Sequence, residues 1–452
     1  MTAHLGNLAL IGNVANSGVI DAQDGAANDT ITIFGDYFGA GQLLIDVDFA
    51  ADVSDMLVVN GDVTGDATSV RITDISSGNA SGNDVLVVDV TGDTSDGDFV
   101  LSGGAITASA YDYYLEQSGS QWLLNAVMNS TGDVYEAFAD ALSGFGKLST
   151  LGQRVGQRQW LSYDDVRWTT QPSTGAWLRF HADRSSNTPE SSTSGNQYDT
   201  DFYGIQVGYD IRRDASENGY WVFGLTGQYG DANTSLSSGT GAGSISSEGY
   251  GLGATATWYG DNNLYVDLLG QVSWINSDLS STTSGMLVNG HSSAAYALSA
   301  EVGKRMELGA NSAIIPQAQL TRTGLDGGTL TDSAENYVEF GASDSVIARL
   351  GLGYEYTGDV FFGNHAGGGH DEKLYVTGNL FHNFSGANDV NVAGDILSAD
   401  VEATWVEIGA GGSFVWDGNK TFYTEASYRT ALGSNDGQNE GFELNIGLKV
   451  KW

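Results

Sequence analysis

The sequence of 452 residues contains no cysteine and only three prolines, and its 18 basic residues face 56 acidic ones, for a net charge of −38. The lack of cysteine excludes disulfide scaffolds, zinc–cysteine sites and thiol nucleophiles. The shortage of positive charge argues against a nucleic-acid partner, because an acidic surface repels phosphate. With 41% apolar and 11% aromatic residues, the chain is not expected to be disordered.

Long apolar runs are also missing. No stretch of roughly 18 apolar residues occurs, so the sequence encodes no transmembrane helix. The first residues show no basic segment followed by an apolar one, so no signal peptide is visible, and we expect a fragment whose leader is missing. The 63 glycines, together with short alternating segments that contain tyrosine and tryptophan, favour β structure.

Residues 1 to about 125 are rich in Asp, Gly, Asn, Thr and Val. Short apolar segments recur between clusters of turn-forming residues. These segments lie at 31–34, 43–47, 56–59, 85–88 and 99–101. Their irregular spacing, roughly 12 to 27 residues, favours the turns of a β-helix, in which each turn packs on its neighbours. An ordinary β-sandwich is the alternative.

Residues 126–160 change character, because apolar residues now recur at spacings of three and four, which predicts a helix. The apolar positions are Val134, Phe138, Ala141, Leu142, Phe145, Leu148 and Leu151. Asp133 and Glu136 lie near the start of this segment. Lys147, Arg154 and Arg158 lie near its end, which the helix dipole favours. Glycines weaken such a helix but let it pass through a narrow space. A surface helix between two domains is the alternative.

The last residues alternate between an apolar and a polar face. The apolar face consists of Phe442, Leu444, Ile446, Leu448, Val450 and Trp452. Eleven residues at about 3.3 Å each span roughly 36 Å, enough to cross a bilayer when tilted. We count about twelve such strands, over approximately 175–185, 198–213, 219–231, 246–260, 262–277, 291–307, 312–323, 337–357, 373–384, 400–416, 419–432 and 441–452.

The connections between these strands mostly alternate in length, as in an outer-membrane barrel. The long ones are expected at about 183–197, 232–245, 278–290, 324–336, 385–399 and 433–440. Twelve strands enclose a lumen too wide to be filled by their own side chains, so the aromatic-rich face is expected to contact lipid. Pro316 falls inside a strand, where we expect a bulge or a broken ladder bond.

Polar side chains on the opposite face are therefore expected to line the lumen. They are Asp267, Gln271, Glu301, Arg349, Glu355, Glu407, Glu425 and Arg429. Arg154 and Arg158 could pair with lumen carboxylates such as Glu301 or Glu355, or they could face water at the barrel mouth.

Taken in order, these segments resemble the C-terminal part of an autotransporter, a type V secretion protein. Residues 101–125, with Tyr111, Tyr113, Leu115, Trp122 and Leu124, resemble the end of a β-helical passenger and its autochaperone segment. Residues 134–138 and 148–156, which include Tyr135, resemble the pore-spanning helix. Residues 251–259, 316–320 and the final Trp452 resemble barrel strands.

The resemblance implies an all-β fold: a right-handed parallel β-helix fragment over 1–125, a pore-threading helical linker over 126–160, and a twelve-stranded antiparallel transmembrane β-barrel with that helix inside it over 161–452. It implies a translocator in the outer membrane of a Gram-negative bacterium that exports its own passenger and anchors it at the cell surface. Implied partners are outer-membrane lipids, periplasmic chaperones and the barrel-assembly machinery, which recognises a C-terminal strand ending in an aromatic residue.

Other functions have weaker support. A porin or channel with an N-terminal β domain is the main alternative, and a barrel-embedded hydrolase lacks a visible Ser/His/Asp set. Asn125 and Asn129 lie where some family members cut their passenger, but the paired-asparagine pattern is absent. His365, His370, Asp371 and Glu372 form a glycine-rich turn that we interpret as a solvated loop. We therefore expect no catalytic residues, cofactor or metal ion.

Overall fold

The computed structural model describes residues 6–156, 174–214, 219–358, 371–385, 388–400, 403–416, 419–433 and 439–452. They form two compact units. The first comprises Met1–Gly132 with Leu330–Val338 and Asn391–Ile396, and the second comprises Asp133–Thr329, Glu339–Val390 and Leu397–Trp452. Within the described ranges, every helix is too short or too polar to cross a bilayer.

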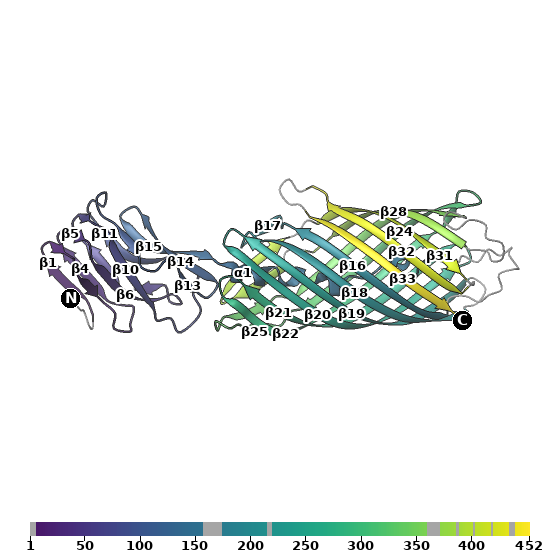
Figure 1. Cartoon of the computed structure of the whole chain (residues 1–452), viewed down its shortest axis with the longest axis horizontal. Coiled ribbons are helices and arrows are strands. Elements are labelled where there is room, and N and C mark those ends of the chain that lie inside the picture. The colour runs from purple at the N-terminus through teal and green to yellow at the C-terminus, as the bar shows by residue number, and fades with distance from the viewer. Residues whose placement is uncertain are drawn as a thin grey trace. The chain divides into compact units, whose positions relative to one another are not determined.

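In the first unit, strands from successive turns of the chain pair in parallel and build three sheets (Figure 1). The first sheet contains β1 (Leu8–Ile11), β4 (Thr30–Phe34), β8 (Met56–Val59) and β11 (Val85–Val90). The second sheet contains β3 (Val19–Asp21), β6 (Gln42–Asp48), β10 (Thr68–Asp74) and β12 (Phe99–Leu101). The third sheet contains β2 (Val14–Ala15), β5 (Tyr37–Gly39) and β9 (Val63–Gly65). This solenoid agrees with the expected parallel β-helix. Its predicted right-handedness stays a prediction.

Asn and Asp side chains at one corner connect each turn to the next. The amide N–H of Asp36 donates to Asn13 Oδ1 at 2.9 Å, and that of Asp62 donates to Asp36 Oδ1 at 3.1 Å. The amide of Asp93 continues the ladder by donating to Asp62 Oδ1 at 2.8 Å. Glycine precedes each of these residues because the turns approach closely: a Cβ on Gly61 would lie 2.5 Å from the carbonyl oxygen of the turn before it.

Parallel pairing ends at an antiparallel hairpin. β15 (Gln121–Met128) pairs with β11 on one side and with β14 (Tyr111–Ser118) on the other. β13 (Ile106–Ala108) pairs with the other edge of β14. The side chains of Tyr111, Tyr113, Trp122 and Leu124 are buried in this hairpin and Leu115 is half-buried. The residues expected in the autochaperone segment therefore pack on the last solenoid turns.

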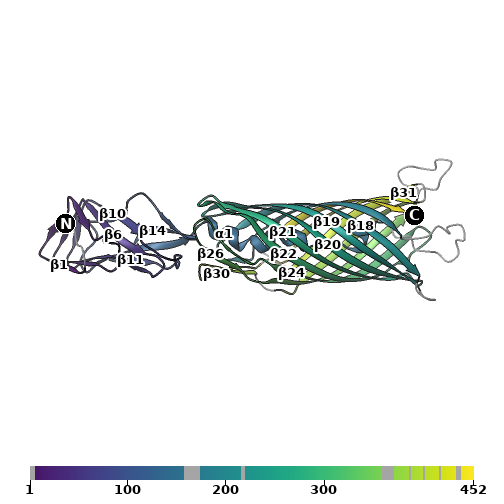
Figure 2. The ribbon, with the colours of Figure 1, turned by 90° about the horizontal axis from the view of Figure 1, so that it is seen from below.

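The second unit is a closed antiparallel barrel of twelve strands, as predicted (Figure 2). They are β16 (Gly175–Asn187), β18 (Gln197–Asp214), β19 (Gly219–Ser238), β20 (Gly241–Gly260), β21 (Leu264–Ser281), β22 (Gly285–Lys304), β24 (Ser312–Asp326), β27 (Ser343–Thr357), β28 (Asp371–Asn383), β31 (Thr404–Trp416), β32 (Lys420–Ala431) and β33 (Glu440–Lys451). Pairing of β16 with β33, and of β22 with β24, leaves no open edge. At Pro316 the ladder with β22 is interrupted, since pairing stops at Gly303–Gln317 and resumes at Met306–Ile314 in β23 (Met306–Glu307).

Two of the predicted long loops are strands instead. Residues 232–245 belong to β19 and β20, and 278–290 belong mostly to β21 and β22. The sequence alternates through both stretches, but there the outward positions are polar. These stretches therefore have the composition of loops, although they belong to strands. Other long connections carry a five-stranded sheet of β17 (Ser191–Ser192), β30 (Asp395–Asp400), β29 (Asn388–Val392), β26 (Tyr337–Phe340) and β25 (Thr329–Thr331).

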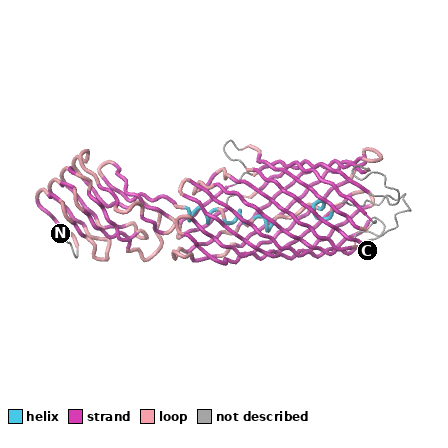
Figure 3. Tube along the Cα trace, in the orientation of Figure 1, coloured by secondary structure: helices cyan, strands magenta, loops and turns pink. Residues whose placement is uncertain are grey.

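The expected helix is present but broken into short pieces inside the barrel (Figure 3). These are α1 (Ser130–Glu136), α2 (Phe138–Ala141), α3 (Ser143–Gly146) and α4 (Leu151–Val155). The prediction of one helix over 126–160 is wrong in two respects. β15 continues through Met128, and the chain is extended at Lys147, directly after the helix-weakening Gly144 and Gly146. Thr150 restarts the helix with a capping box to Gln153.

Candidate functional site

The outer surface of the barrel carries the predicted apolar stripe. On β33, Phe442, Ile446, Leu448 and Trp452 are exposed and Leu444 and Val450 are half-buried. The intervening Glu443, Asn445 and Lys449 are buried in the lumen. Because water would not favour so many large apolar side chains on an outer surface, hydrocarbon is the solvent that this face fits.

The polarity of the wall inverts along single strands. On β19, the outward residues Leu225 and Tyr229 are followed by the exposed Asn233 and Ser235, with no change in alternation. The inward side inverts as well, because Thr226 is followed by Leu236. The stretch from Trp221 to Tyr229 measures roughly 26 Å along the strand, close to the apolar band of a bilayer. The end of the barrel near Ser238 is thus built like a water-soluble barrel with an apolar core.

Tyrosines mark the boundary between the two regions. The hydroxyl of Tyr229 donates to Glu248 Oε2 at 3.0 Å, and that of Tyr428 donates to Glu440 Oε2 at 2.8 Å. Such rings keep an apolar body in hydrocarbon and a polar tip in the interface. The boundary therefore lies toward the end of the barrel where Asp133 and Glu136 of α1 contact Ser238 and Ser192.

Helices α1 to α3 fill the apolar end of the lumen. Val134, Tyr135, Phe138, Leu142 and Phe145 are all buried, as predicted for the pore helix. The packing depends on glycines of both the plug and the barrel wall. A Cβ on Gly144 of the plug would lie 2.5 Å from the ring of Phe202. Cβ atoms on Gly230 and Gly249 of the wall would lie 3.2 and 2.9 Å from the ring of Phe145. Small residues on one surface therefore receive aromatic rings from the other.

The backbone of this plug is also held by the barrel wall. The carbonyl oxygen of Phe145 accepts hydrogen bonds from Gln271 Nε2 at 3.1 Å and from Ser273 Oγ at 3.1 Å. At the break between α3 and α4, Lys147 Nζ lies 2.6 Å from both Asp183 and Glu443. The lumen wall thus satisfies the carbonyl of Phe145 and the ammonium of Lys147 at the point where the helix is interrupted.

Arg154 on α4 forms the most buried ion pair of the plug. Its guanidinium donates to both carboxylate oxygens of Asp267, at 2.7 and 2.9 Å, and the two side chains are 2% and 4% exposed. Tyr423 holds the same residue from the other side by donating to its carbonyl oxygen at 2.6 Å. Arg154 therefore pairs with a lumen carboxylate, as one of the two alternatives expected, but its partner is Asp267 and not Glu301 or Glu355. Asp267 lies directly opposite Glu301 in the β21–β22 ladder, so the sequence does not reveal which of the two carboxylates binds Arg154.

The other predicted lumen residues also face inward. Gln271, Glu301, Arg349, Glu355 and Glu425 are buried, and Glu407 and Arg429 are half-buried. Glu301 accepts the amide N–H of Leu151 at 3.1 Å and lies 3.3 Å from Arg349, so it helps to position α4. Arg429 bonds Asp183 at 3.2 Å. Leu151 is buried, Leu148 is half-buried, and Arg158 lies outside the described residues.

Sequence reasoning missed several lumen groups. Thr257 and Tyr423 contact Arg154, Lys449 pairs with Asp210 at 2.8 Å, and Arg179 donates to Gln206 at 3.0 Å. All lie on the polar face of strands that were predicted correctly. Their alternation could have revealed them.

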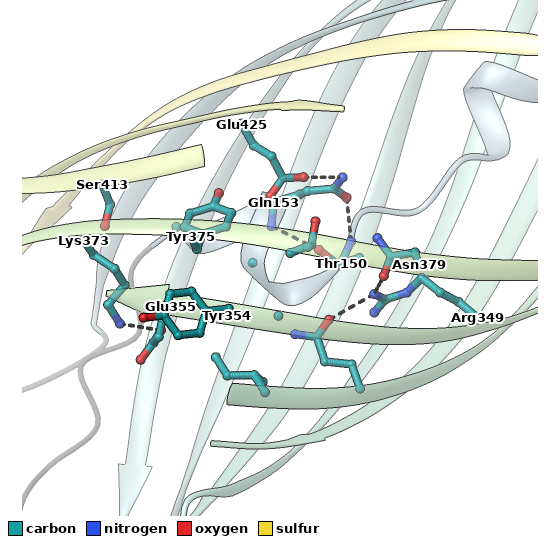
Figure 4. A pocket seen from close by; sticks show the side chains of 16 residues that line it. Thr150, Gln153, Arg349, Tyr354, Glu355, Lys373, Tyr375, Asn379, Ser413 and Glu425 are labelled. Carbon is teal, nitrogen blue, oxygen red and sulfur yellow. Dashed lines mark hydrogen bonds and ion pairs between the residues drawn. The ribbon is translucent and has the colours of Figure 1, made fainter. Parts of the chain in front are cut away.

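A cavity of about 80 Å³ remains between α4 and strands β24, β27, β28, β31 and β32 (Figure 4). Its wall is polar: Gln153 donates to Glu425 at 3.0 Å, and Lys373 donates to Glu355 at 2.9 Å. This space would hold a few water molecules, each of which occupies about 30 Å³ in the liquid. Beside α4, this cavity leaves room for a few solvent molecules.

No group of three or more His, Asp or Glu side chains in the described ranges is arranged to hold a metal ion. His365 and His370, the histidines of the glycine-rich turn, lie outside those ranges. Asn129 is buried and its amide oxygen accepts the N–H of Thr131 at 2.9 Å.

An antiparallel barrel with a lipid-facing girdle and a helix fastened in its lumen defines the class: a plugged outer-membrane β-barrel. Comparison with known families is more specific. Residues 176–427 match the family described as autotransporter beta-domain, and residues 8–115 match autochaperone domain type 1. The chain belongs to the autotransporter family, and its barrel resides in the outer membrane with the passenger exposed at the cell surface.

Among curated relatives, the chain is 32% identical to the adhesin BmaC autotransporter of Brucella suis over 97% of its own length, and 27% identical to the probable autotransporter YfaL of Escherichia coli over 78%. It spans 14% and 31% of their lengths. The transport unit of the autotransporter AIDA-I from Escherichia coli has the same barrel fold, with a TM-score of 0.57, 18% identity, and coverage of 72% of this chain and 99% of that one.

Proposed function

We propose that residues 174–452 form the translocator through which the solenoid of residues 6–128 reached the cell surface, and that the helices α1 to α4 are the trace of that passage. The observation that carries the proposal is the plug itself. It runs from the lumen end near Ser192 and Ser238, which contact Glu136 and Asp133, to the opposite half, where Arg154 binds Asp267. A chain that had crossed the barrel C-terminal part first would be left in this position.

The driving force for export of the solenoid must come from folding outside the membrane, because no ATP is available at the outer membrane. Each solenoid turn that forms buries apolar side chains such as Ile33, Leu57 and Val88 against the preceding turn. The hairpin β14–β15 can form locally and then pair with β11, so the solenoid turns would form one after another from that end. Folding in this order would prevent the chain from slipping back.

The proposed partners follow from the same account. Lipids contact the stripe of β33, and the barrel-assembly machinery reads that strand with its terminal Trp452. Periplasmic chaperones hold the chain before insertion. We propose no enzyme activity for this chain. Because the chain spans only 14% and 31% of the lengths of these two relatives, their activities are not assigned to it.

The alternative of a porin is tested by conductance in planar bilayers. The full chain should conduct little, since the lumen cavity is small. Deletion of residues 130–156 should open a large, steady conductance. Large openings in the full chain, unchanged by the deletion, would contradict the proposal and favour the porin.

A second experiment tests surface anchoring. In intact bacteria that express the chain behind a signal peptide, an added protease should remove residues 6–128 and spare the barrel. The matched control is the same chain in lysed cells, where periplasmic epitopes become accessible as well. Protection of the solenoid in intact cells would contradict export.

A further inference from the structure

Three carboxylates are buried together in the first turns of the solenoid, Asp29, Asp46 and Asp55, and each is at most 2% exposed. Asp55, between β7 (Val53–Ser54) and β8, joins the other two. Its Oδ1 accepts the amide N–H of Asp29 at 3.0 Å, and its Oδ2 accepts the amide N–H of Asp46 at 2.8 Å. We refer to these three residues as the acid trio.

The remaining bonds of the acid trio also come from backbone amides. Asp46 Oδ2 accepts N–H groups from Asp24 at 2.9 Å and Gly25 at 2.7 Å. Asp29 Oδ1 accepts the amide of Gly6 at 2.7 Å. The second oxygen, Asp29 Oδ2, is buried and has no hydrogen-bond donor among the described residues. A buried carboxylate oxygen without a donor is costly when the group is charged.

Residues 6–129 offer the acid trio almost no positive charge. They contain 18 acidic side chains and a single basic one, Arg71. Arg71 lies exposed on β10, where the residue opposite Asp46 is the neutral Thr73. Asp84, which precedes β11 as Asp55 precedes β8, accepts the amide of Ala126 at 3.0 Å and adds only negative charge. The described residues also offer no group of three ligands placed around a metal ion.

We propose that the acid trio is a proton-binding site: one proton, held at Asp55, leaves two buried charges in place of three and strengthens the first solenoid turns. Three unpaired charges in one buried cluster repel each other and lose their hydration, whereas a protonated carboxyl is a donor and carries no charge. Asp55 is the member that accepts backbone N–H groups from both of the others, so a proton there lowers the repulsion on each of them.

The electrostatics give the pH range. Burial, the largest cause, raises the pKa of Asp55 from 3.8 to about 6, against the lowering effect of its two amide donors, and the charges of Asp46 and Asp29 raise it further. The folded state therefore holds the proton more tightly than the unfolded chain. The resulting stabilisation is fully present below pH 4 or so and is lost as the pH rises through about 6.

Hydrogen exchange of the full chain in detergent micelles tests this proposal. Corrected for the intrinsic pH dependence of exchange, opening of peptides that cover residues 24–58 should be about 4-fold rarer at pH 5.5 than at pH 7.5, and about 25-fold rarer at pH 4.5. Peptides of the barrel strand β19 provide an internal reference for changes in the detergent or the instrument.

Two variants separate the acid trio from the general charge of the solenoid. In Asp29→Asn, the amide N–H₂ takes the place of the oxygen without a donor and one buried charge is lost, so opening at pH 7.5 should become rarer. Its pH dependence should be weaker than in the wild type but should remain, because burial still raises the pKa of Asp55. Asp55→Asn removes the titrating group, so its pH dependence should shrink to less than about 2-fold. It should also be less stable, because its amide accepts only one of the two N–H groups. The control Asp24→Asn removes an exposed charge and should keep the dependence of the wild type.

The outcomes are decisive. A wild-type dependence that persists in Asp55→Asn would overturn the proposal. Stabilisation at pH 7.5 by millimolar calcium, absent in Asp29→Asn, would also overturn it, because the acid trio would then be a metal site. These results do not depend on export, which the protease and conductance experiments test separately.

Discussion

The solenoid and the barrel lumen bury acidic side chains in opposite ways. In the lumen, buried carboxylates face cations: Asp267 meets Arg154, and Glu355 meets Lys373. In the solenoid they face backbone amides, as Asp55 does, because residues 6–129 contain one basic side chain. The same residue type therefore satisfies a parallel backbone in one unit and fastens a plug in the other.

The difference follows from what each unit leaves unsatisfied. Tight solenoid corners expose amide N–H groups that a neighbouring carboxylate can accept. The barrel wall satisfies its own backbone, so its inward side chains are available to other partners. Negative charge without cations also suits a segment that crosses a membrane unfolded, since self-repulsion keeps it from aggregating.

Arg154→Met should weaken the plug most. It leaves Asp267 buried without its cation, which costs about 3–5 kcal/mol in other proteins. We expect frequent large openings in planar bilayers. The matched control is Lys147→Met, because Lys147 is also a plug cation paired with carboxylates, Asp183 and Glu443, but its side chain is 36% exposed. Equal conductance of the two variants would contradict the special role of the buried pair.

Leu225→Arg should destabilise the barrel by about 2–4 kcal/mol, the cost of a cation on a lipid-facing position near the bilayer centre. Ser235→Arg, on the same face of β19, should change the stability by less than about 0.5 kcal/mol. Urea unfolding in lipid vesicles compares the two. Similar losses would mean that the polarity inversion along β19 does not mark the end of the hydrocarbon.

Gly61→Ala should destabilise the solenoid by about 1–3 kcal/mol, since the new Cβ would lie 2.5 Å from Asp36 Oδ1 and from a backbone carbonyl. In Gly78→Ala the nearest atom is 3.6 Å away, so this control should be nearly neutral. Hydrogen exchange of the solenoid peptides reports both. If the two variants behave alike, the corner does not require glycine.

Asp62→Asn should have the smallest effect, within about 0.5 kcal/mol. The amide oxygen can still accept the N–H of Asp93, and one charge is removed from the exposed ladder. Stability should therefore depend less on salt than in the wild type. The ladder would have to act through charge rather than hydrogen bonding if the variant lost more than about 2 kcal/mol in hydrogen-exchange measurements.

Much of the barrel could be predicted from the sequence, because alternation of apolar residues reports directly which face meets lipid. Twelve strands, the inward Glu301 and Arg349, and the outward Phe442 and Trp452 all follow from that pattern. The strand extensions at 232–245 were missed for the same reason. There the outer surface is polar, as at Ser235, and the pattern inverts.

Contacts across the lumen could not be predicted. Arg154 had several carboxylates within reach, and its choice of Asp267 over the neighbouring Glu301 depends on how α4 is rotated in the barrel. The break at Lys147 likewise follows from the bonds that the wall offers to Phe145 and Lys147. The acid trio joins Asp29, Asp46 and Asp55 from two successive turns, and their register is a property of the solenoid.

Spin labels at positions 225 and 235 test the central claim, that β19 passes from hydrocarbon into water without changing its alternation. Both side chains point outward. In lipid vesicles, the label at 225 should collide often with oxygen and rarely with a water-soluble nickel chelate, and the label at 235 should do the reverse. Equal exposure of both labels to the nickel chelate would contradict a membrane-spanning barrel.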